Sequence, residues 1–242
     1  MAKPNIIELP DGTRVDILYE DRSVMAIDKP PGWMLAPVSW DKTSRNLHRE
    51  LMLSMQAGEF WAHSRNLRYI RFIHRLDAET SGVVLLARNA GSLSVMSRLF
   101  ETRQMRKKYL AVVRGVPAQK SWTCRLKITA EPDNEGRIQI DARHGREAET
   151  AFVVLEQGPA SALIEASPLT GRTHQIRVHL ASAGHPILGD VLYGEPGPAL
   201  ALRAVELSYT DPFQKRPVRI LAPKEKFLQR VRQLLAQKPN PS

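Results

Sequence analysis

The nonapeptide His74-Arg75-Leu76-Asp77-Ala78-Glu79-Thr80-Ser81-Gly82 decides how the rest of this chain is interpreted. Apolar runs at 69–73 and 83–87 flank it, and both favour β-structure, so a sharp connection between two buried strands is predicted. Residues 80–82 supply the hydroxyls and the glycine that tight turns require. The connection presents one carboxylate, that of Asp77. On the residues alone, a reactive carboxylate on a rigid loop and a surface salt bridge are both open interpretations.

A second informative loop follows two predicted strands, at 15–19 and 24–28. It reads Lys29-Pro30-Pro31-Gly32-Trp33, and its prolines and glycine cannot continue a strand. We therefore expect a stiff loop at this point. Lys29 is either a functional cation or a solvated surface lysine.

A third stretch, Lys107-Lys108-Tyr109-Leu110-Ala111-Val112-Val113, lies in a predicted strand at 105–113. Alternation places Tyr109, Ala111 and Val113 on one face of that strand. A tyrosine on such a face ordinarily only packs against its neighbours. Another reason is needed to assign it a chemical role.

The fourth stretch is Thr170-Gly171-Arg172-Thr173-His174-Gln175-Ile176-Arg177-Val178-His179-Leu180. We predict that a helix begins here, capped by Thr170 or Thr173, and ends near Gly184. Its first turns would carry several strong hydrogen-bond donors. Such donors at a helix N-terminus suit an anionic ligand, although a solvated surface is the simpler explanation for any one of them.

Together these stretches resemble the signatures of the RluA family of RNA pseudouridine synthases. The nonapeptide matches H-R-L-D-x-x-T-S-G at all seven specified positions, and Lys29–Gly32 resembles the first motif of the family, although Trp33 departs from its usual leucine. The strand and helix stretches resemble the family's second and third motifs, and His185–Gly194 follows as H-P-I-L-G-D-x-L-Y-G. The resemblance extends over about residues 16–222.

The resemblance implies an α+β fold, with a mixed, mainly antiparallel central sheet flanked by helices and loops and a cleft across the sheet. We expect one catalytic domain over residues 1–242, with its core at about 16–222, a short N-terminal arm and a C-terminal helix at 224–237. Only a short arm precedes the first motif, so we expect no S4 RNA-binding module. Between the motifs, helices are predicted from Thr43 or Ser44 to Gln56 and over 89–101, and closing strands over 202–209 and 218–222.

The resemblance also implies a reaction. Pseudouridine formation breaks the N1–C1′ bond of a uridine, turns the base and joins C5 to C1′, and it requires neither a metal nor a cofactor. Asp77 is the implied nucleophile, acting at C1′, at C6 or through a glycal. Arg177 is implied to hold its carboxylate, since a guanidinium is the strongest partner for that planar group. Tyr109 is implied to stack on the base and to assist proton removal from C5.

A uridine in folded RNA must leave its stack before it can react. Arg75, beside the implied nucleophile, is the candidate to occupy the vacated space. The remaining residues that we expect to bind RNA or substrate are His74, Lys29, Arg172, His174 and Gln175. Between Gly58 and Ile70, Trp61 interleaves with Arg65 and Arg68, which suits stacking on RNA bases, although a packed tryptophan is the simpler reading.

Composition is compatible with these implications. The net charge of +10 over 242 residues favours a polyanionic partner, because Lys and Arg release counterions from phosphates. The single cysteine, Cys124, excludes an intrachain disulfide and a cysteine-based zinc site, which suits the cytoplasm. No apolar run is long enough to span a membrane. We expect RNA, either rRNA or tRNA, as the partner of a monomer.

Two other classes of function remain to be weighed. A metal-dependent hydrolase would use His74, Asp77, His174 and His179, but the two helix histidines are five residues apart and so lie on different faces. A non-catalytic RNA-binding protein would keep the fold and lose turnover. The presence of all three implied active-site residues argues against that loss.

Overall fold

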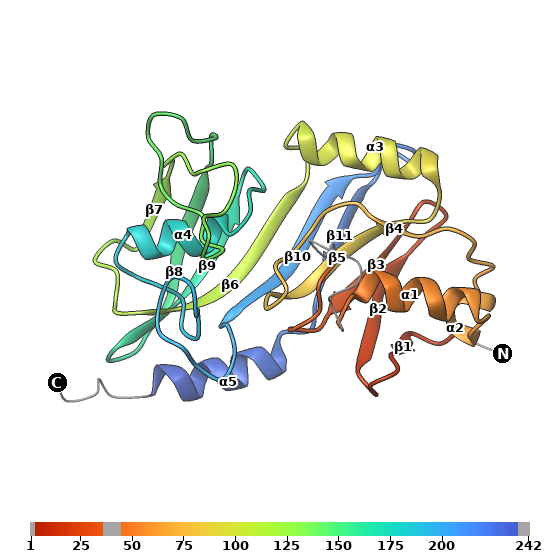
Figure 1. The fold of residues 1–242 in the computed structure, drawn as a ribbon, viewed down its shortest axis with the longest axis horizontal. Helices are drawn as coiled ribbons and strands as arrows, with labels where there is room; N and C mark the ends of the chain where they lie inside the picture. Colours follow the sequence, from red (N-terminus) through yellow and green to blue (C-terminus); the bar gives the residue numbers. More distant parts are fainter. Residues whose placement is uncertain (1–2, 36–44, 237–242) are drawn as a thin grey trace. The chain divides into compact units, whose positions relative to one another are not determined.

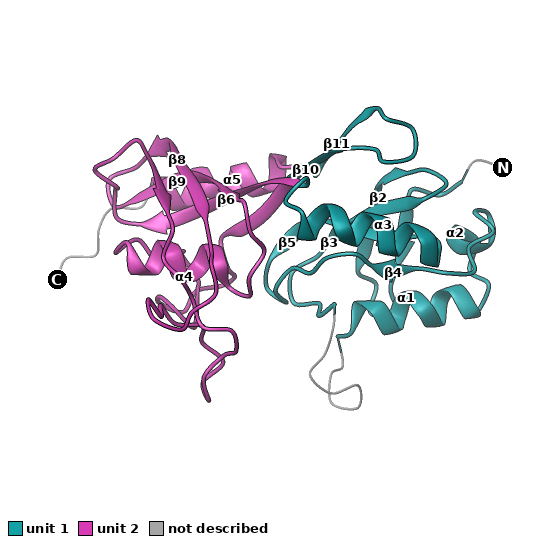
Figure 2. Cartoon of the chain, turned by 90° about the horizontal axis from the view of Figure 1, so that it is seen from above, with its two compact units in different colours: residues 1–105, 206–222 teal, residues 106–205, 223–242 magenta. Residues whose placement is uncertain are grey.

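The computed structural model describes residues 3–35 and 45–236, and its fold is α+β, as the resemblance implied. The chain forms two compact units (Figure 2). Unit 1 contains residues 1–105 and 206–222, and unit 2 contains residues 106–205 and 223–242. Strand β10 (Leu202–Thr210) passes from one unit into the other, since its first four residues belong to unit 2 and its remainder to unit 1. The single domain of 1–242 stays a prediction.

Unit 1 is built on antiparallel strands that neighbour one another in the order β1, β2, β3 and β5, with β4 also paired to β5 and β11 paired to β10 (Figure 1). The elements are β1 (Ile6–Glu8), β2 (Arg14–Glu20), β3 (Val24–Lys29), α1 (Leu47–Gln56), α2 (Phe60–His63), β4 (Arg71–Phe72), β5 (Ser81–Ala87), α3 (Ala90–Glu101) and β11 (Pro217–Leu221).

The core of unit 1 lies around β3 and β5. Strand β3 is apolar at residues 24–27 and β5 at residues 83–87, and these runs are buried on both faces, as continuous hydrophobic runs predict. Helix α3 covers β5 and contributes Met96, with Leu99 and Phe100 packed beside it, at the three- and four-residue spacing of an inward helix face. Strands β10 and β11 add Leu207 and Ile220 to the same cluster.

Helix α1 begins later than predicted. Its N-cap is Asn46, whose side-chain oxygen accepts a hydrogen bond from the backbone N–H of Arg49 at 3.1 Å. Thr43 and Ser44, the predicted caps, lie outside the described residues. For helix α3 the predicted boundary is confirmed, since Asn89 caps it by the same type of bond to Ser92.

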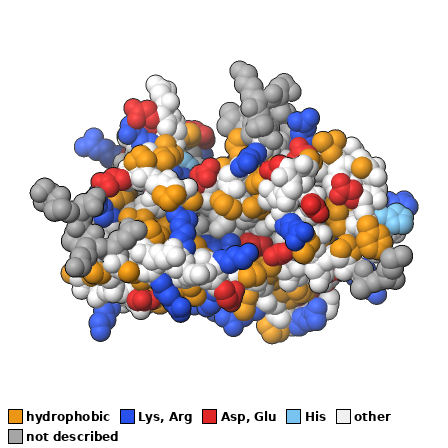
Figure 3. All heavy atoms as spheres, turned by 90° about the horizontal axis from the view of Figure 1, so that it is seen from below, with side chains coloured by type: hydrophobic (Ala, Val, Ile, Leu, Met, Phe, Trp, Pro, Cys, Tyr) orange, Lys and Arg blue, Asp and Glu red, His pale blue; other side chains and the backbone are white. Residues whose placement is uncertain are grey.

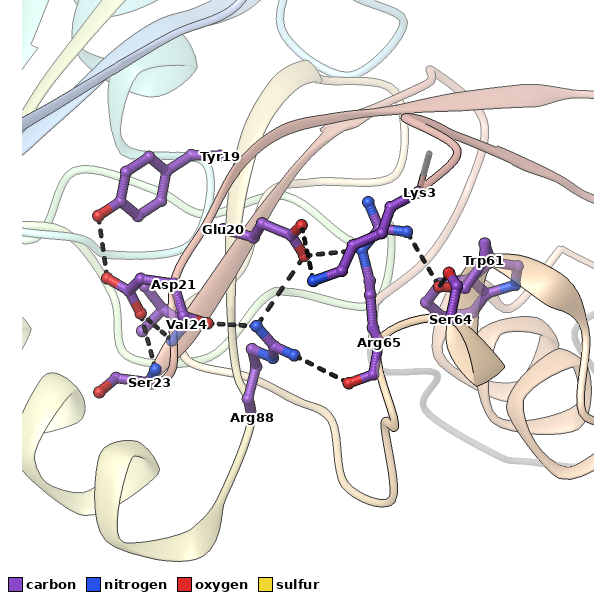
Figure 4. A network of polar contacts seen from close by, with 10 residues as sticks. All are labelled: Lys3, Tyr19, Glu20, Asp21, Ser23, Val24, Trp61, Ser64, Arg65 and Arg88. Carbon is purple, nitrogen blue, oxygen red and sulfur yellow. Dashed lines mark hydrogen bonds and ion pairs between the residues drawn. The ribbon is translucent and has the colours of Figure 1, made fainter. Parts of the chain in front are cut away.

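The segment that contains Trp61 and Arg65 belongs to the interior of unit 1. The indole Nε1 of Trp61 donates to Ser54 Oγ at 2.6 Å, and the buried Arg65 donates to Glu20 at 2.7 Å and to the carbonyl of Trp61 at 3.0 Å. Figure 4 shows Arg88 joining the same network, which ties the segment after α2 to β2 and to the end of β5. Trp61 and Arg65 are buried, which does not fit the expected stacking on RNA bases. Arg68 is exposed and remains the candidate for RNA binding in this segment.

Unit 2 is built on strands β6, β9, β8 and β7, which are antiparallel neighbours in that order. Helices α4 and α5 both contact β9. The elements are β6 (Arg106–Arg114), β7 (Ser121–Cys124), β8 (Thr150–Gln157), β9 (Ser161–Pro168), α4 (Gln175–Ser182) and α5 (Glu225–Leu235). The predicted end of the last helix, Gln237, lies outside the described residues.

Helix α4 also begins later than predicted, and neither Thr170 nor Thr173 caps it. Its N-cap is His174, which has a left-handed backbone (φ 52°, ψ 14°) and no side-chain capping bond. The buried side chain of Gln175 instead accepts from Thr170 Oγ1 at 2.7 Å and from the backbone N–H of Arg172 at 3.0 Å. Because these bonds hold the preceding loop, the helix can start only after it.

Candidate active site

Asp77 lies half-buried on the loop between β4 and β5, so the predicted connection between strands is confirmed. The first strand is shorter than the predicted run at 69–73 and is not buried. The two strands pair directly, with Phe72 opposite Leu86, so the loop is held at both ends. The carbonyl of Asp77 accepts from the backbone N–H of Thr80 at 3.1 Å, which closes a turn directly after the acid. The sheet therefore presents this carboxylate from a fixed backbone.

Lys29 lies beneath that loop and is fully buried. Its ammonium group donates to three backbone carbonyls, of Pro30 at 3.0 Å, of Ala78 at 2.6 Å and of Thr80 at 2.9 Å. An ammonium has three N–H donors, and these bonds use all of them. The predicted contact of Lys29 with RNA does not fit this environment, because the side chain instead holds the backbone on both sides of Glu79.

Electrostatics connect the same lysine to the acid. Burial lowers the pKa of Lys29 to about 7, while the negative charges of Glu79 and Asp77 act in the opposite direction. The lysine therefore lies within electrostatic reach of the predicted nucleophile.

His74 is turned toward the protein interior. Its Nε2 accepts a hydrogen bond from the backbone N–H of Leu85 at 3.1 Å, and its ring stacks on Phe100 with centroids 4.7 Å apart. These contacts attach the loop to β5 and α3 and argue against a primary role in binding RNA. Arg75, the next residue, is exposed, as its predicted role in the vacated base stack requires.

Tyr109 lies on β6 opposite Ala166 of β9 and is 8% exposed. Two residues earlier on the strand, Lys107 donates to the carbonyl of Thr170 at 2.8 Å. Burial lowers the pKa of this lysine to about 8. Lys107 therefore joins the strand of Tyr109 to the loop before α4, a role that the sequence did not suggest.

Arg177 projects from the middle of α4 and is 5% exposed. Its Nε donates to Asp190 Oδ2 and its Nη2 to Asp190 Oδ1, both at 2.8 Å. Its guanidinium carbon also lies 5.2 Å from the ring centroid of Tyr193. The block that contains Asp190 and Tyr193 was recognised in the sequence, but no role was predicted for either residue.

The other three predicted RNA-binding residues of unit 2 fall into different environments. Gln175 is buried, and its amide nitrogen donates to the carbonyl of Glu149 and to Thr150 Oγ1, both at 2.9 Å, so a structural role replaces the predicted RNA contact. His174 is half-buried and shares a hydrogen bond of 2.9 Å with the hydroxyl of Tyr193. Arg172 is exposed.

The predicted site residues divide between the units. Asp77, His74, Arg75 and Lys29 belong to unit 1, whereas Tyr109, Arg172, His174, Gln175 and Arg177 belong to unit 2. Each unit thus assembles its own part of the predicted site. The pairing of Asp77 with Arg177 stays a prediction.

The environment of the histidines bears on the metal-hydrolase alternative. His179 is fully buried, is hydrogen-bonded to Thr150 Oγ1 at 3.1 Å and contacts the carbonyl of Leu126 at 3.0 Å. Burial lowers the pKa of its imidazole. Within residues 3–35 and 45–236, no group of three or more His, Cys, Asp or Glu side chains is arranged to hold a metal ion.

In the same ranges, no helix combines the length and apolar character needed to cross a membrane.

Known proteins resemble this chain over most of its length. The family model described as RNA pseudouridylate synthase matches residues 23–182. Ribosomal large subunit pseudouridine synthase C of Salmonella typhi is 34% identical over 241 residues, covering 92% of this chain and 70% of that protein. The enzyme of the same name from Vibrio vulnificus is 31% identical over 233 residues, covering 90% and 69%.

Solved structures agree with this resemblance. Human RNA pseudouridylate synthase domain containing 4 aligns with a TM-score of 0.73 at 25% identity, covering 93% of this chain and 94% of that one. Human RNA pseudouridylate synthase domain containing 1 aligns with a TM-score of 0.69 at 26% identity, covering 94% and 97%. The likeness therefore includes the fold as well as the motifs.

The fold and the matches to known proteins together define an RNA-modifying isomerase. The chain belongs to the RNA pseudouridylate synthase family. It is an enzyme that converts uridine in RNA to pseudouridine.

Proposed function

We propose that Asp77 is the nucleophile of this reaction and that Arg177 and Tyr109 complete the site around it. The observation that carries the proposal is the loop itself: a half-buried carboxylate lies between β4 and β5, on a backbone held by the buried Lys29. A nucleophile is effective when its geometry is fixed before substrate arrives. The nonapeptide match supplies the identity of the acid.

The chemistry is an exchange of bonds within one nucleotide. The N1–C1′ bond breaks, the base turns, and the C5–C1′ bond forms. The proton on C5 is then lost and N1 gains one, so no atom is added or removed. Asp77 would stabilise the detached fragment covalently at C1′ or C6, or promote a glycal. The phenol of Tyr109 would stack on the base and assist removal of the C5 proton.

The RNA would be held by basic residues on each unit that are exposed or half-buried. Arg75 projects from the loop of Asp77 and would fill the space that the flipped uridine leaves. Arg172 and His174 lie just before α4, where backbone N–H groups and the helix dipole favour phosphate. Gln175 and Lys29 would act indirectly, by fixing the loops that carry these residues.

The substrate that we propose is large-subunit ribosomal RNA, with tRNA as the alternative. Support comes from the names of the two bacterial relatives, which cover this chain almost completely. We also propose that the enzyme acts as a cytoplasmic monomer. Mapping pseudouridine in total RNA from cells with and without the gene would identify the site, and a missing modification in tRNA alone would redirect the assignment.

A substitution of the acid tests the proposed chemistry. We expect Asp77→Asn to lower turnover at least about 1,000-fold, because an amide is not a nucleophile of comparable strength, while the Kd for RNA changes less than about threefold. Tritium release from RNA labelled at C5 of uridine measures turnover, and filter binding measures affinity. Glu79→Gln, an exposed neighbour on the same loop, is the control and should remain active.

If Asp77→Asn kept normal turnover, the assignment of the nucleophile would be wrong. A purely RNA-binding protein would show no turnover in the unaltered chain either. The two results are therefore distinguishable in one assay.

A further inference from the structure

The segment of unit 1 that precedes the nonapeptide is strongly basic. Residues 60–73 contain three arginines and neither aspartate nor glutamate. Arg65 is buried, whereas Arg68 and Arg71 are exposed. Arg71 is the first residue of β4, the strand that leads into the loop of Asp77, and the sequence predicted no role for it.

Arg71 is held in place by neutral groups. Its Nη1 donates to Nε2 of His48 on α1 at 2.8 Å and to the sulfur of Met52, one turn further along that helix, at 3.9 Å. Its guanidinium carbon lies 5.9 Å from the ring centroid of Tyr69. These contacts orient an exposed guanidinium without neutralising its charge.

The hydrogen bond with His48 has only one possible direction. A guanidinium can only donate, so Nε2 of the imidazole accepts and the ring proton lies on Nδ1. Burial lowers the pKa of His48 and the charge of Arg71 lowers it further, although a hydrogen bond with the backbone of Ile70 acts in the opposite direction. The imidazole is therefore neutral near pH 7. Its ring also lies 5.8 Å from that of Phe72 on β4, so both elements hold the acceptor in place.

These contacts leave one edge of the guanidinium available. Within the part of the chain that the structure describes, the hydrogen bonds of Arg71 come from Nη1 alone. Nε and Nη2, which form a complete edge of the planar group, can still donate to a ligand. Two parallel N–H groups on one edge match the oxygens of a phosphate.

Other exposed arginines use their donors differently. Nη2 of Arg219 donates to Glu206 at 2.7 Å, and Nε of Arg125 donates to Glu149 at 3.0 Å. Among the described residues, none that contacts Arg71 is acidic. A guanidinium that is oriented but keeps its charge suits a polyanion, because no existing ion pair has to be broken when the polyanion binds.

We propose that Arg71 binds a phosphate of the substrate RNA close to the uridine that reacts, with His48 and Tyr69 orienting its guanidinium. The proposal deepens the proposed function and rests on it, because it places the reacting uridine at Asp77. Arg71 precedes Asp77 by six residues, so their Cα atoms are at most about 20 Å apart, a distance that a stacked strand covers in about six nucleotides. The phosphate therefore belongs to a nucleotide near the target in the same RNA.

The test compares Arg71→Ala with the unaltered enzyme. The substrate is total RNA from cells that lack the gene, which carries the unmodified target and is labelled at C5 of uridine for tritium release. We expect the apparent KM to rise at least about fivefold while kcat stays within about twofold, because the lost contact is to a part of the RNA that does not react. In filter binding with the same RNA, the slope of log K against log salt concentration should fall by about one.

Arg219→Ala is the matched control. Arg219 is also an exposed arginine of unit 1, but it is paired with Glu206. We expect this variant to change neither the KM nor the salt slope. An equal rise in KM for the two variants would show a general effect of surface charge and would overturn the proposal.

Arg71→Lys separates the shape of the group from its charge. A lysine keeps the charge but lacks the edge with two parallel donors. We expect a normal salt slope and a KM that stays at least about threefold above normal. A KM within twofold of normal for Arg71→Ala, or full recovery of KM in Arg71→Lys, would overturn the proposal. If the alanine variant does not fold, the lysine variant alone decides.

Asp77→Asn is assayed in parallel to distinguish the two proposals. If it is inactive while Arg71→Ala has a normal KM, this inference fails alone. If Asp77→Asn is fully active, the proposed function fails, and the placement of the phosphate contact beside the reacting uridine fails with it.

Discussion

A buried ammonium group supports the loop that carries the predicted nucleophile. Lys29 satisfies three backbone carbonyls, two of which, those of Ala78 and Thr80, follow Asp77 closely in the chain. The carbonyl of Ala78 also accepts from the backbone N–H of Gly32 at 2.9 Å. A buried carbonyl that loses its donor costs about 1–3 kcal/mol. One lysine therefore both stabilises unit 1 and fixes the backbone next to the acid.

Lys29→Met tests this role against the predicted contact with RNA. We expect the free energy of unfolding to fall by about 1–3 kcal/mol and kcat to fall at least about tenfold, because the loop loses its anchor. The Kd for RNA should change less than threefold. Lys108→Met, at a partly exposed lysine paired with Glu165, is the control. If binding weakened while kcat held, the original prediction of an RNA contact would be right.

The same lysine should give unit 1 a measurable pH dependence. Its pKa is about 7 in the folded protein and ordinarily 10.5, so between these values the unfolded chain binds more protons at this position. Its contribution to stability must therefore rise with pH across that window, by at most about 1.4 kcal/mol per unit. Urea unfolding of the unaltered and Lys29→Met proteins from pH 7 to 10 measures the difference. A difference that is flat or falls with pH would contradict this expectation.

At the level of single residues, sequence patterns located Asp77 and its loop but not the environment of each neighbour. The nonapeptide contains no signal that His74 turns inward to Leu85 and Phe100, because both contacts arise from distant segments. The role of Lys29 could not be predicted for the same reason, since two of the three carbonyls that bind it lie about fifty residues away. Asp190 had a signal, its place in a matched block, but its partner became evident only from the structure.

Among the elements, the turn at Gly189 controls the block that holds Arg177. Gly189 has a positive φ of 76°, and a Cβ there would clash with the backbone carbonyl of Ala199. Both the backbone conformation and the close approach of two segments therefore require glycine. The conformation of this turn places Asp190, the next residue.

A pair of glycine substitutions separates these two requirements. Gly184→Ala should lower the free energy of unfolding by about 1–2 kcal/mol, because that residue also has a positive φ (81°) but its Cβ would meet nothing within 4 Å. Gly189→Ala should cost about 1–3 kcal/mol more, because the fixed carbonyl of Ala199 must move, and should also lower kcat. Thermal or urea unfolding measures the costs, and equal costs for the two variants would show that the clash relaxes freely.

Element boundaries show what local pattern can and cannot predict. The strands at 15–19, 24–28 and 105–113 were correct within a residue or two, because long apolar runs mark them clearly. The start of α4 was wrong, because the choice between Thr170, Thr173 and His174 depends on a buried Gln175 that holds the loop. The residues of β1 were predicted as part of an N-terminal arm, because a strand of three residues is too short to show an alternating pattern of apolar and polar residues.

For the molecule as a whole, the net charge of +10 favours RNA binding, and the number of basic side chains that contact phosphate determines how that binding responds to salt. On the face drawn in Figure 3, Lys and Arg side chains are interspersed with acidic and hydrophobic side chains and do not form a separate basic patch. Several exposed arginines are paired with acids, as Arg137 is with Asp133 and Glu135. Such pairs already neutralise their charge, so the count of 35 Lys and Arg residues overstates the number of phosphates that the surface can neutralise.

The salt dependence of binding identifies which arginines meet phosphate. We expect Arg172→Ala to reduce the slope of log K against log salt concentration by about one, because one phosphate contact is lost. Arg137→Ala, at an arginine already neutralised by two acids, should leave the slope unchanged. Filter binding between 50 and 200 mM salt measures both, and equal slopes for the unaltered and Arg172→Ala proteins would exclude a phosphate contact at Arg172.

Unit 1 is built from two parts that are distant in the sequence, and this governs when it can fold during synthesis. Its core contains Leu207, Val218 and Ile220, which come from β10 and β11, beside residues of the first hundred. A ribosome must therefore synthesise the chain through β11 before this core can close. The early segment that bears the proposed nucleophile remains incompletely packed while β6 to β9 are synthesised. A protease supplied during translation should cut the nascent amino-terminal third until the last strand is released.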